Sequence, residues 1–173
     1  MRRLSDTLSR LAAFRALPSM RASPGVDRLR DLRQFGSNPG ALRARFYVPE
    51  ALPSNAPLVV VLHGCTQTAA EYDHGSGWSR LADLHKFALL YPEQRRANNA
   101  MLCFNWFEPD DIRRDAGEAL SIRQMIEALA VQHGIDRRRI FVTGLSAGGA
   151  MTSVMLATYP ELFAAGAIIA GLP

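Results

Sequence analysis

A serine inside a glycine-rich pentapeptide is the residue of this sequence best suited to covalent chemistry. Ser146 stands in Gly144-Leu145-Ser146-Ala147-Gly148, which matches the pattern Gly-x-Ser-x-Gly. In a nucleophile elbow this pattern forms a sharp turn between a strand and a helix, and the turn exposes the serine hydroxyl. Glycines flank the serine because Cβ atoms at those places would collide with the neighbouring strand or helix. We therefore predict that Ser146 is the nucleophile of an acyl-transfer reaction.

The segments on both sides of the pentapeptide have the composition that an elbow requires. Residues 140–143 form a β-branched and aromatic run typical of a buried strand, and residues 149–156 are compatible with a helix. The N-terminal end of such a helix directs backbone N–H groups and its positive dipole end toward an oxyanion at Ser146. The alternative is a glycine-rich turn that only permits tight packing, since a bare pentapeptide occurs by chance in roughly 5% of chains of this length.

A loop of five residues, 63–67, is the second feature that points to acyl transfer. It directly follows the continuous apolar run Leu58–Leu62. In an α/β-hydrolase the loop after this strand gives one N–H of the oxyanion hole, and the residue after the nucleophile gives the other. We predict that the two donors are the backbone N–H groups of Cys65 and Ala147. His63 is predicted to shape the loop through nearby backbone groups and not to serve as the catalytic base.

Strands and helices alternate along the rest of the chain, a pattern typical of a parallel sheet with right-handed crossovers. We therefore predict the α/β class, with a mostly parallel sheet flanked by helices. Residues 92–111 are predicted to be one long loop, and a loop of this length with an aromatic centre indicates a functional role. The predicted strands are Ala41–Val48, Leu58–Leu62, Ala88–Tyr91, Ile140–Thr143 and Ala165–Ile169, and the predicted helices are Trp78–Phe87, Ile112–His133 and Gly149–Leu156.

Length and charge suggest one folded domain behind a basic leader. The chain has 173 residues, of which 48% are hydrophobic, enough to bury one sizeable core. Residues 1–34 carry eight Arg and three Asp, a net charge of +5, whereas the remaining 12 basic and 13 acidic residues give −1. We expect residues 1–40 to be leader and linker, partly disordered, residues 41–173 to form the domain, and nucleic acid not to be a partner.

The leader itself allows two interpretations. Leu4, Leu8 and Leu11 lie at helical spacing, so residues 1–20 could form a basic amphipathic helix that docks on a membrane or a hydrophobic particle. The alternative is a disordered leader. A secretory signal is not predicted, because Arg10 and Arg15 interrupt what would be its apolar stretch.

Two cysteines, Cys65 and Cys103, are present without a CxxC motif or a histidine cluster, so no metal site is predicted. Taken alone, the residues leave open whether these are two buried thiols or one disulfide. A bridge would close a loop of about 39 residues and stabilise the fold by up to roughly 4 kcal/mol. It would also indicate an oxidising compartment.

Four motifs, in this order along the chain, resemble the poly(3-hydroxybutyrate) depolymerase family of esterases, to which feruloyl and acetylxylan esterases are related. The likeness runs from about Leu42 to Pro173. The motifs are Leu62-His63-Gly64-Cys65-Thr66-Gln67, Leu90-Tyr91-Pro92-Glu93-Gln94, Cys103-Phe104-Asn105-Trp106-Phe107 and Gly144-Leu145-Ser146-Ala147-Gly148-Gly149.

This resemblance implies an α/β-hydrolase that cleaves carboxylic esters with a Ser–Asp–His triad and needs neither metal nor cofactor. It also implies that Cys65 and Cys103 are bridged, and that Gln67 and Trp106 contact the substrate. The family setting implies an extracellular location; the leader, which matches no secretion signal, leaves the cytoplasm as the alternative.

The sequence departs from the family pattern after the nucleophile. In this fold the triad follows the order Ser, then Asp or Glu, then His. The 27 residues after Ser146 contain neither Asp nor His, and their one acidic residue is Glu161. All four histidines precede Ser146, and besides His63 they are predicted to be surface or capping residues: His74, His85 and His133.

We therefore expect the chain to be the N-terminal part of a longer esterase and to be inactive alone, with the triad Asp and His beyond Pro173. The sheet edge at Ala165–Ile169 is then expected to be exposed. Two other functions remain as alternatives: a non-catalytic protein that binds granule or membrane surfaces through the leader, and a nucleotide binder. The last is disfavoured because no Gly-x-Gly-x-x-Gly follows a strand.

Overall fold

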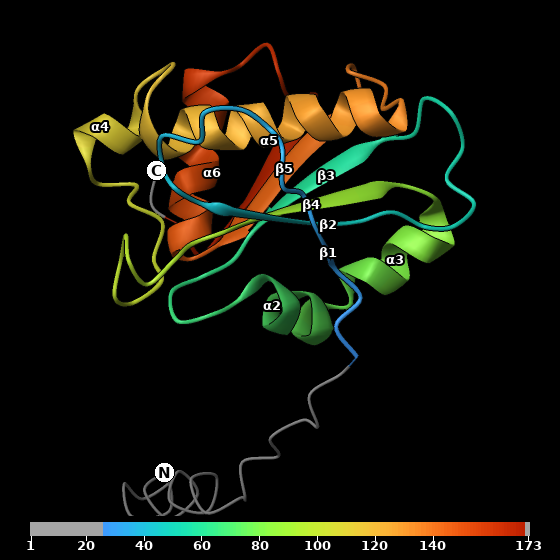
Figure 1. The fold of residues 1–173 in the computed structure, drawn as a ribbon, viewed down its shortest axis with the longest axis horizontal. Helices are drawn as coiled ribbons and strands as arrows, with labels where there is room; N and C mark the ends of the chain where they lie inside the picture. The colour runs from blue at the N-terminus through green and yellow to red at the C-terminus, as the bar shows by residue number, and fades with distance from the viewer. Residues whose placement is uncertain (1–25, 172–173) are drawn as a thin grey trace, which may run out of the picture.

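The computed structural model describes residues 26–171 (Figure 1). The leader helix predicted within residues 1–20 lies outside the described residues. One mixed sheet of six strands, in the order β1-β2-β4-β3-β5-β6, runs through the described part of the chain. Its strands are β1 Arg30–Asp31, β2 Arg43–Tyr47, β3 Leu58–Leu62, β4 Ala88–Glu93, β5 Ile140–Leu145 and β6 Ala165–Ile169.

The four strands β4, β3, β5 and β6 are parallel to one another, and β1 and β2 add an antiparallel edge. Helices connect the parallel strands: α2 Ala69–Ser76, α3 Trp78–His85, α4 Pro109–Ile112, α5 Gly117–His133 and α6 Ala147–Thr158. The predicted α/β class and mostly parallel sheet are confirmed.

Helices cover both faces of this sheet, and successive strand residues face opposite layers. Val60 belongs to one buried cluster with Ile122 of α5 and Met151 of α6. Val61, the next residue, belongs to a second buried cluster with Tyr72 of α2. Figure 1 shows α5 crossing one side of the sheet, with α2 and α3 on the other side. This two-layer cover holds the carboxyl ends of β3 and β5 next to each other.

The strand predictions are correct for β3 and β6, and β2 lies within the predicted range. The prediction that Pro92 ends its strand is wrong, since β4 continues to Glu93. The pairing of β3 with β4 stops at Leu90, so Pro92 lies where β4 has β2 as its one neighbour and needs no further N–H. Strand β1 lies within the segment predicted to be leader and linker, and it pairs with β2.

The helix predictions need two corrections. The long helix predicted from Ile112 is divided into α4 and α5, because Gly117 adopts a left-handed φ of 50° and Asp111 caps the backbone N–H of Glu118 at 3.1 Å. Helix α2 was not predicted, although Thr68 and Glu71 form the capping box that its spacing indicates. The predicted loop at residues 92–111 therefore includes most of α4.

Candidate active site

Ser146 occupies the turn between β5 and α6 in the conformation that an elbow requires. Its φ of 55° and ψ of −117° lie in a region that side-chain-bearing residues rarely adopt, at a cost of about 1–3 kcal/mol. Hydrogen bonds on both sides hold this geometry: Ser146 N–H donates to Ile169 O, and Ala150 N–H donates to Ser146 O, both at 2.9 Å. The side chain is exposed, as a nucleophile must be.

The flanking glycines are there because backbone approaches them closely. A Cβ built on Gly144 would lie 2.2 Å from the carbonyl oxygen of Gly148. A Cβ on Gly148 would lie 2.2 Å from the oxygen of Leu62 and 2.5 Å from that of His63. A side chain at either glycine would therefore collide as predicted, with the helix at Gly144 and with the neighbouring strand at Gly148.

The loop of residues 63–67 lies directly against Ser146. An ideal Cβ on Gly64 would be 3.6 Å from Ser146 Cβ and 3.4 Å from Leu145 O. Within residues 26–171, the backbone N–H groups of Cys65 and Ala147 donate to no protein acceptor. Ala147 is buried at the N-terminus of α6, where an unpaired N–H is a ready anion donor. This arrangement supports the predicted oxyanion donors.

His63 is satisfied by backbone groups, and its predicted loop-shaping role is confirmed. Gln94 N–H donates to His63 Nε2 at 3.1 Å, so the ring proton is on Nδ1, which donates to Gly64 O at 2.8 Å. The ring is buried, and burial lowers the pKa of His63 below its usual value. A neutral imidazole with both nitrogens engaged cannot accept the proton of Ser146.

Cys65 and Cys103 form a disulfide with Cα atoms 4.2 Å apart, which confirms the implied pairing. The bond fastens the loop of residues 63–67 to the segment that follows β4. Gln67 Oε1 accepts Gly64 N–H at 2.8 Å, so this side chain supports the loop. Trp106 is half-buried against the main core and packs edge-on against Phe107. Contact of Gln67 or Trp106 with a substrate stays a prediction.

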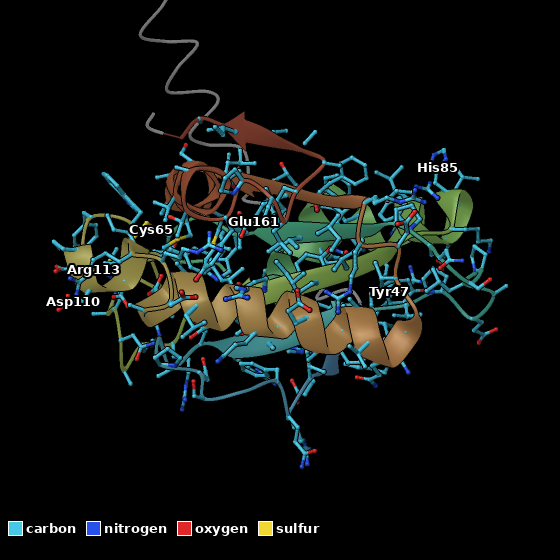
Figure 2. The ribbon with its side chains drawn as sticks, turned by 90° about the horizontal axis from the view of Figure 1, so that it is seen from above. Tyr47, Cys65, His85, Asp110, Arg113 and Glu161 are labelled. Atoms are coloured by element: carbon cyan, nitrogen blue, oxygen red, sulfur yellow. A yellow bond between two sulfur atoms is a disulfide. The ribbon has the colours of Figure 1, made fainter. Side chains whose placement is uncertain are left out.

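No histidine in residues 26–171 is hydrogen-bonded to Ser146. His85 ends α3 and lies at the opposite end of the molecule from Cys65 (Figure 2). His133, predicted to be a surface or capping residue, is half-buried in the last turn of α5 with its ring 5.6 Å from that of Phe46. His74 is exposed in the last turn of α2. The one acid after the elbow, Glu161, pairs with Arg114. Within residues 26–171, Ser146 and the predicted oxyanion donors therefore lie together, and no histidine is hydrogen-bonded to Ser146.

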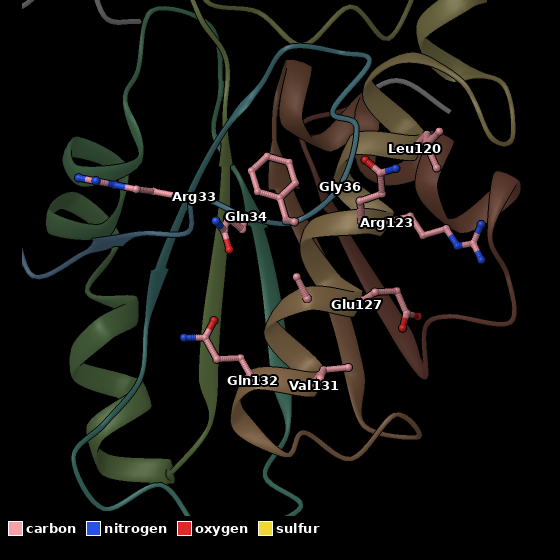
Figure 3. A pocket seen from close by; sticks show the side chains of 11 residues that line it. Arg33, Gln34, Gly36, Leu120, Arg123, Glu127, Val131 and Gln132 are labelled. Carbon is pink, nitrogen blue, oxygen red and sulfur yellow. The ribbon is translucent and has the colours of Figure 1, made fainter.

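A separate cavity of about 970 Å³ lies between residues 33–36 and α5 (Figure 3). It is lined by Arg33 and Phe35 on one side and by Arg123, Gln124 and Glu127 of α5 on the other. Ser146 is not among its lining residues, so this cavity is not the site of acyl transfer. In the part of the chain that the structure describes, no group of His, Cys, Asp and Glu could hold a metal ion.

Two buried side chains behind the site, Gln94 and Glu118, were not predicted. Gln94 hydrogen-bonds to Glu118 and to the carbonyl of Cys103. One signal was available for Gln94, since it ends the second of the four motifs. Nothing in the local pattern marks Glu118, which the sequence places within the predicted helix of residues 112–133.

The matching family model is that of the esterase PHB depolymerases, which covers residues 42–172. Over 97% of its length the chain is 54% identical to poly(3-hydroxyalkanoate) depolymerase C of Paucimonas lemoignei, of which it covers 41%. It is 38% identical to acetylxylan esterase A of Aspergillus oryzae, covering 87% of this chain and 48% of the relative. The chain therefore spans about half the length of these curated relatives, or less.

Solved structures agree with this assignment. An acetyl xylan esterase from Aspergillus awamori matches with a TM-score of 0.79 and 34% identity, over 83% of this chain and 52% of that one. A poly(3-hydroxybutyrate) depolymerase from Bordetella parapertussis shares the fold, with a TM-score of 0.66 and 19% identity over 81% of this chain and 50% of that one. The chain belongs to the PHB depolymerase family of esterases, within the α/β-hydrolase fold.

Proposed function

We propose that this chain carries the nucleophile half of a serine carboxylic-ester hydrolase that acts through an acyl-enzyme on Ser146. The observation that supports this most strongly is the juxtaposition at the elbow. An exposed serine with φ of 55° stands beside two backbone N–H groups, those of Cys65 and Ala147, that lack a protein acceptor. Esters are the substrates of the family to which the chain belongs.

In the proposed reaction Ser146 Oγ attacks the ester carbonyl carbon, and its proton passes to a base. The carbonyl oxygen becomes an oxyanion that accepts hydrogen bonds from Cys65 N–H and Ala147 N–H, each worth about 3 kcal/mol of barrier. The C–O bond then breaks, the alcohol leaves with the proton, and water releases the acyl group from Ser146. Since no described histidine reaches Ser146, we assign the base and its acidic partner to polypeptide outside residues 26–171.

Polyesters and acetyl esters are the two substrate classes proposed, because the relatives are named for poly(3-hydroxyalkanoate) and acetylxylan. Gln67 and Trp106 are proposed to contact the substrate beside the disulfide. The Cys65–Cys103 bridge favours an oxidising compartment, and we propose an extracellular location on this ground. No helix within residues 26–171 is long and apolar enough to cross a membrane.

A chimera tests this function directly. Residues 1–173 replace the matching segment of the Paucimonas lemoignei depolymerase, and the rest of that relative's chain is kept. We expect the chimera to hydrolyse p-nitrophenyl butyrate, and Ser146→Ala to reduce turnover at least about a thousandfold. Ser76→Ala, an exposed serine of α2, is the matched control and should be fully active. A folded chimera that keeps its activity after Ser146→Ala would refute the proposal.

The 173-residue chain alone is expected to turn over this ester barely or not at all. Without a base to activate the serine, only the oxyanion donors and substrate binding accelerate the reaction. Robust turnover that Ser146→Ala abolishes would show that one of the upstream histidines serves as the base.

Docking of the basic leader on a hydrophobic surface is a second proposal, and it rests on the helical spacing of Leu4, Leu8 and Leu11. Co-sedimentation with poly(3-hydroxybutyrate) granules and with anionic vesicles tests it. The full chain should sediment with one of them and a chain lacking residues 1–25 should not. Equal sedimentation of the two chains would exclude this role.

A further inference from the structure

Glu118 is a completely buried carboxyl group in the first turn of α5. Its Oε1 accepts a hydrogen bond from Gln94 Nε2 at 2.5 Å, and its Oε2 accepts one from Asn105 N–H at 3.0 Å. No Lys or Arg within residues 26–171 pairs with it at salt-bridge distance. Burial raises the pKa of Glu118 to about 8. Burying a carboxyl group without a cation costs free energy, so the presence of Glu118 at this position requires an explanation.

Gln94 is the residue through which Glu118 reaches the active site. Besides its bond to Glu118, Gln94 Nε2 donates to the carbonyl oxygen of Cys103 at 3.0 Å. The backbone N–H of Gln94 donates to His63 Nε2, and its side-chain oxygen accepts from Asn98 Nδ2 at 3.0 Å. Every polar group of the Gln94 side chain is therefore committed to the structure behind the elbow.

Two series of contacts lead from Gln94 to the loop that carries the proposed oxyanion donor, one from its backbone N–H and one from its side-chain amide. One passes through His63, whose Nδ1–H fixes the carbonyl of Gly64, the residue before Cys65. The other passes through Cys103, whose sulfur is bonded to Cys65 itself. Gln94 is thus connected to the loop of residues 63–67 through His63 and through the disulfide. Glu118, on helix α5, holds the side chain of Gln94 in place.

We propose that Gln94 and Glu118 are positioning residues, which hold the Cys65 N–H at its place beside Ser146. The catalytic meaning of this role rests on the proposed function, because the N–H is an oxyanion donor in that function alone. A donor displaced by about 1 Å costs roughly a hundredfold in rate, so a rigid support behind the loop is required.

The chemistry of this support demands two acceptor oxygens at residue 118. Both neighbours, Gln94 Nε2 and Asn105 N–H, are donors, and a carboxyl group offers a lone pair to each whether or not it is ionised. A glutamine at position 118 would turn its NH₂ group toward one of these donors. Glu118→Gln therefore keeps the size of the side chain and breaks one of the two bonds.

Amide hydrogen exchange on the full 173-residue oxidised chain tests the proposal. The reporters are Gly64 N–H, which donates to Gln67 Oε1, and Thr66 N–H, which donates to Met101 O at 2.6 Å. At pH 7 we expect Glu118→Gln to speed exchange at both reporters by roughly tenfold. This factor corresponds to a decrease of about 1.4 kcal/mol in the free energy of local opening. The amides of Val60 and Val142 in the central strands should keep their rates.

Two further variants keep the test decisive. Gln94→Asn shortens the amide so that it cannot reach both Cys103 O and Glu118, and it should give the same local effect if Glu118→Gln fails to fold. Glu127→Gln, on the exposed side of the same helix with Arg137 as its ion-pair partner, is the matched control and should change nothing at the reporters. Unchanged reporters, or equal acceleration at Val60 and Val142, would overturn the proposal.

A kinetic readout connects the support to the reaction. In the chimera, Glu118→Gln should lower kcat at least tenfold and leave KM within about twofold, since an oxyanion donor acts in the transition state. An inactive wild-type chimera would count against the proposed function, whereas an active chimera with unchanged kcat after Glu118→Gln would count against the positioning role. Exchange at Gly64 and Thr66 is measured without substrate, so it tests the positioning role independently of the proposed function.

Discussion

The carbonyl oxygen of Ile169 accepts the backbone N–H of Ser146 at 2.9 Å, so the edge strand β6 holds Ser146 in its turn. That strand, β6, is paired with β5 on one side, and all five of its residues are exposed. The exposed edge predicted at Ala165–Ile169 is therefore confirmed. The position of Ser146 therefore depends on a strand at the edge of the sheet.

This edge should drive self-association of the 173-residue chain, because an open strand with apolar side chains is a template for further pairing. Ile168 and Ile169 each expose 47% of their surface. We expect Ile168→Lys to shift the chain toward the monomer in sedimentation velocity. Leu84→Lys is the control, since Leu84 is an exposed leucine of α3, away from the edge. If both lysines reduce association equally, general solubility and not the β6 edge is responsible.

The elbow glycine Gly148 should be intolerant of any side chain. A methyl group there meets Leu62 O at 2.2 Å, which requires β3 or α6 to move, so we expect Gly148→Ala to lower the free energy of unfolding by at least about 2 kcal/mol. Urea denaturation measures the change. Gly75→Ala provides the contrast: no atom lies within 4 Å of its Cβ, and alanine in helix α2 should be neutral or stabilising by up to about 1 kcal/mol.

The Cys65–Cys103 disulfide should contribute to stability and to the site separately. Replacing both cysteines by serine is expected to lower the free energy of unfolding by about 2–4 kcal/mol, because the unfolded chain regains the freedom of a long loop. In the chimera it should also lower kcat, since the loop of residues 63–67 loses one of its anchors. Thermal unfolding with and without reductant provides the check on the unmodified chain. A reductant-insensitive melting temperature would contradict this account.

Glu118 should give the chain a pH-dependent stability of defined sign. Burial, with a smaller effect of Asp111, raises its folded pKa from 4.5 to about 8, so between these values the folded state keeps a proton that the unfolded state has lost. Its contribution is complete below about pH 4.5 and is lost as the pH rises through 8. From pH 6.5 to 8 the free energy of unfolding should fall by about 2 kcal/mol, at 1.4 kcal/mol per pH unit.

His63 and His133 act in the opposite direction near pH 6.5, because burial lowers their folded pKa values while the unfolded chain still binds protons there. The difference between the wild type and Glu118→Gln therefore isolates the contribution of Glu118. Urea titrations at several pH values measure the slope, which Glu118→Gln should remove and Glu127→Gln should leave in place. A wild-type slope that is flat or rising over this window would show that Glu118 is ionised in the folded state.

The elbow and the central strands were predictable because their signals are local. Gly144, Ser146 and Gly148 mark a turn that one pentapeptide defines, and the apolar run Leu58–Leu62 has polar or turn-forming residues at both ends. The division between α4 and α5 was not predictable, because the helical spacing of apolar residues continues without a break through residues 112–133. The start of the second helix is a tertiary detail: the side chain of Asp111 accepts the N–H of Glu118 in the first turn of α5.

The support behind the site escaped prediction for a related reason. A glutamate in a helical pattern normally faces solvent, and the burial of Glu118 depends on Gln94 and Asn105, which come from another part of the chain. The disulfide, by contrast, was implied by family resemblance and left open by the spacing of Cys65 and Cys103. Long-range partners are what the local sequence pattern does not contain.

The claim that Ser146 forms the acyl-enzyme has one direct measurement. The chimera is mixed with p-nitrophenyl acetate, quenched with acid during the burst, digested and mapped by mass spectrometry. We predict an acetyl group on the peptide that contains Ser146, in the wild-type chimera and not in the Ser146→Ala variant. An active chimera acetylated at another residue, or hydrolysis that continues unchanged in Ser146→Ala, would contradict the account.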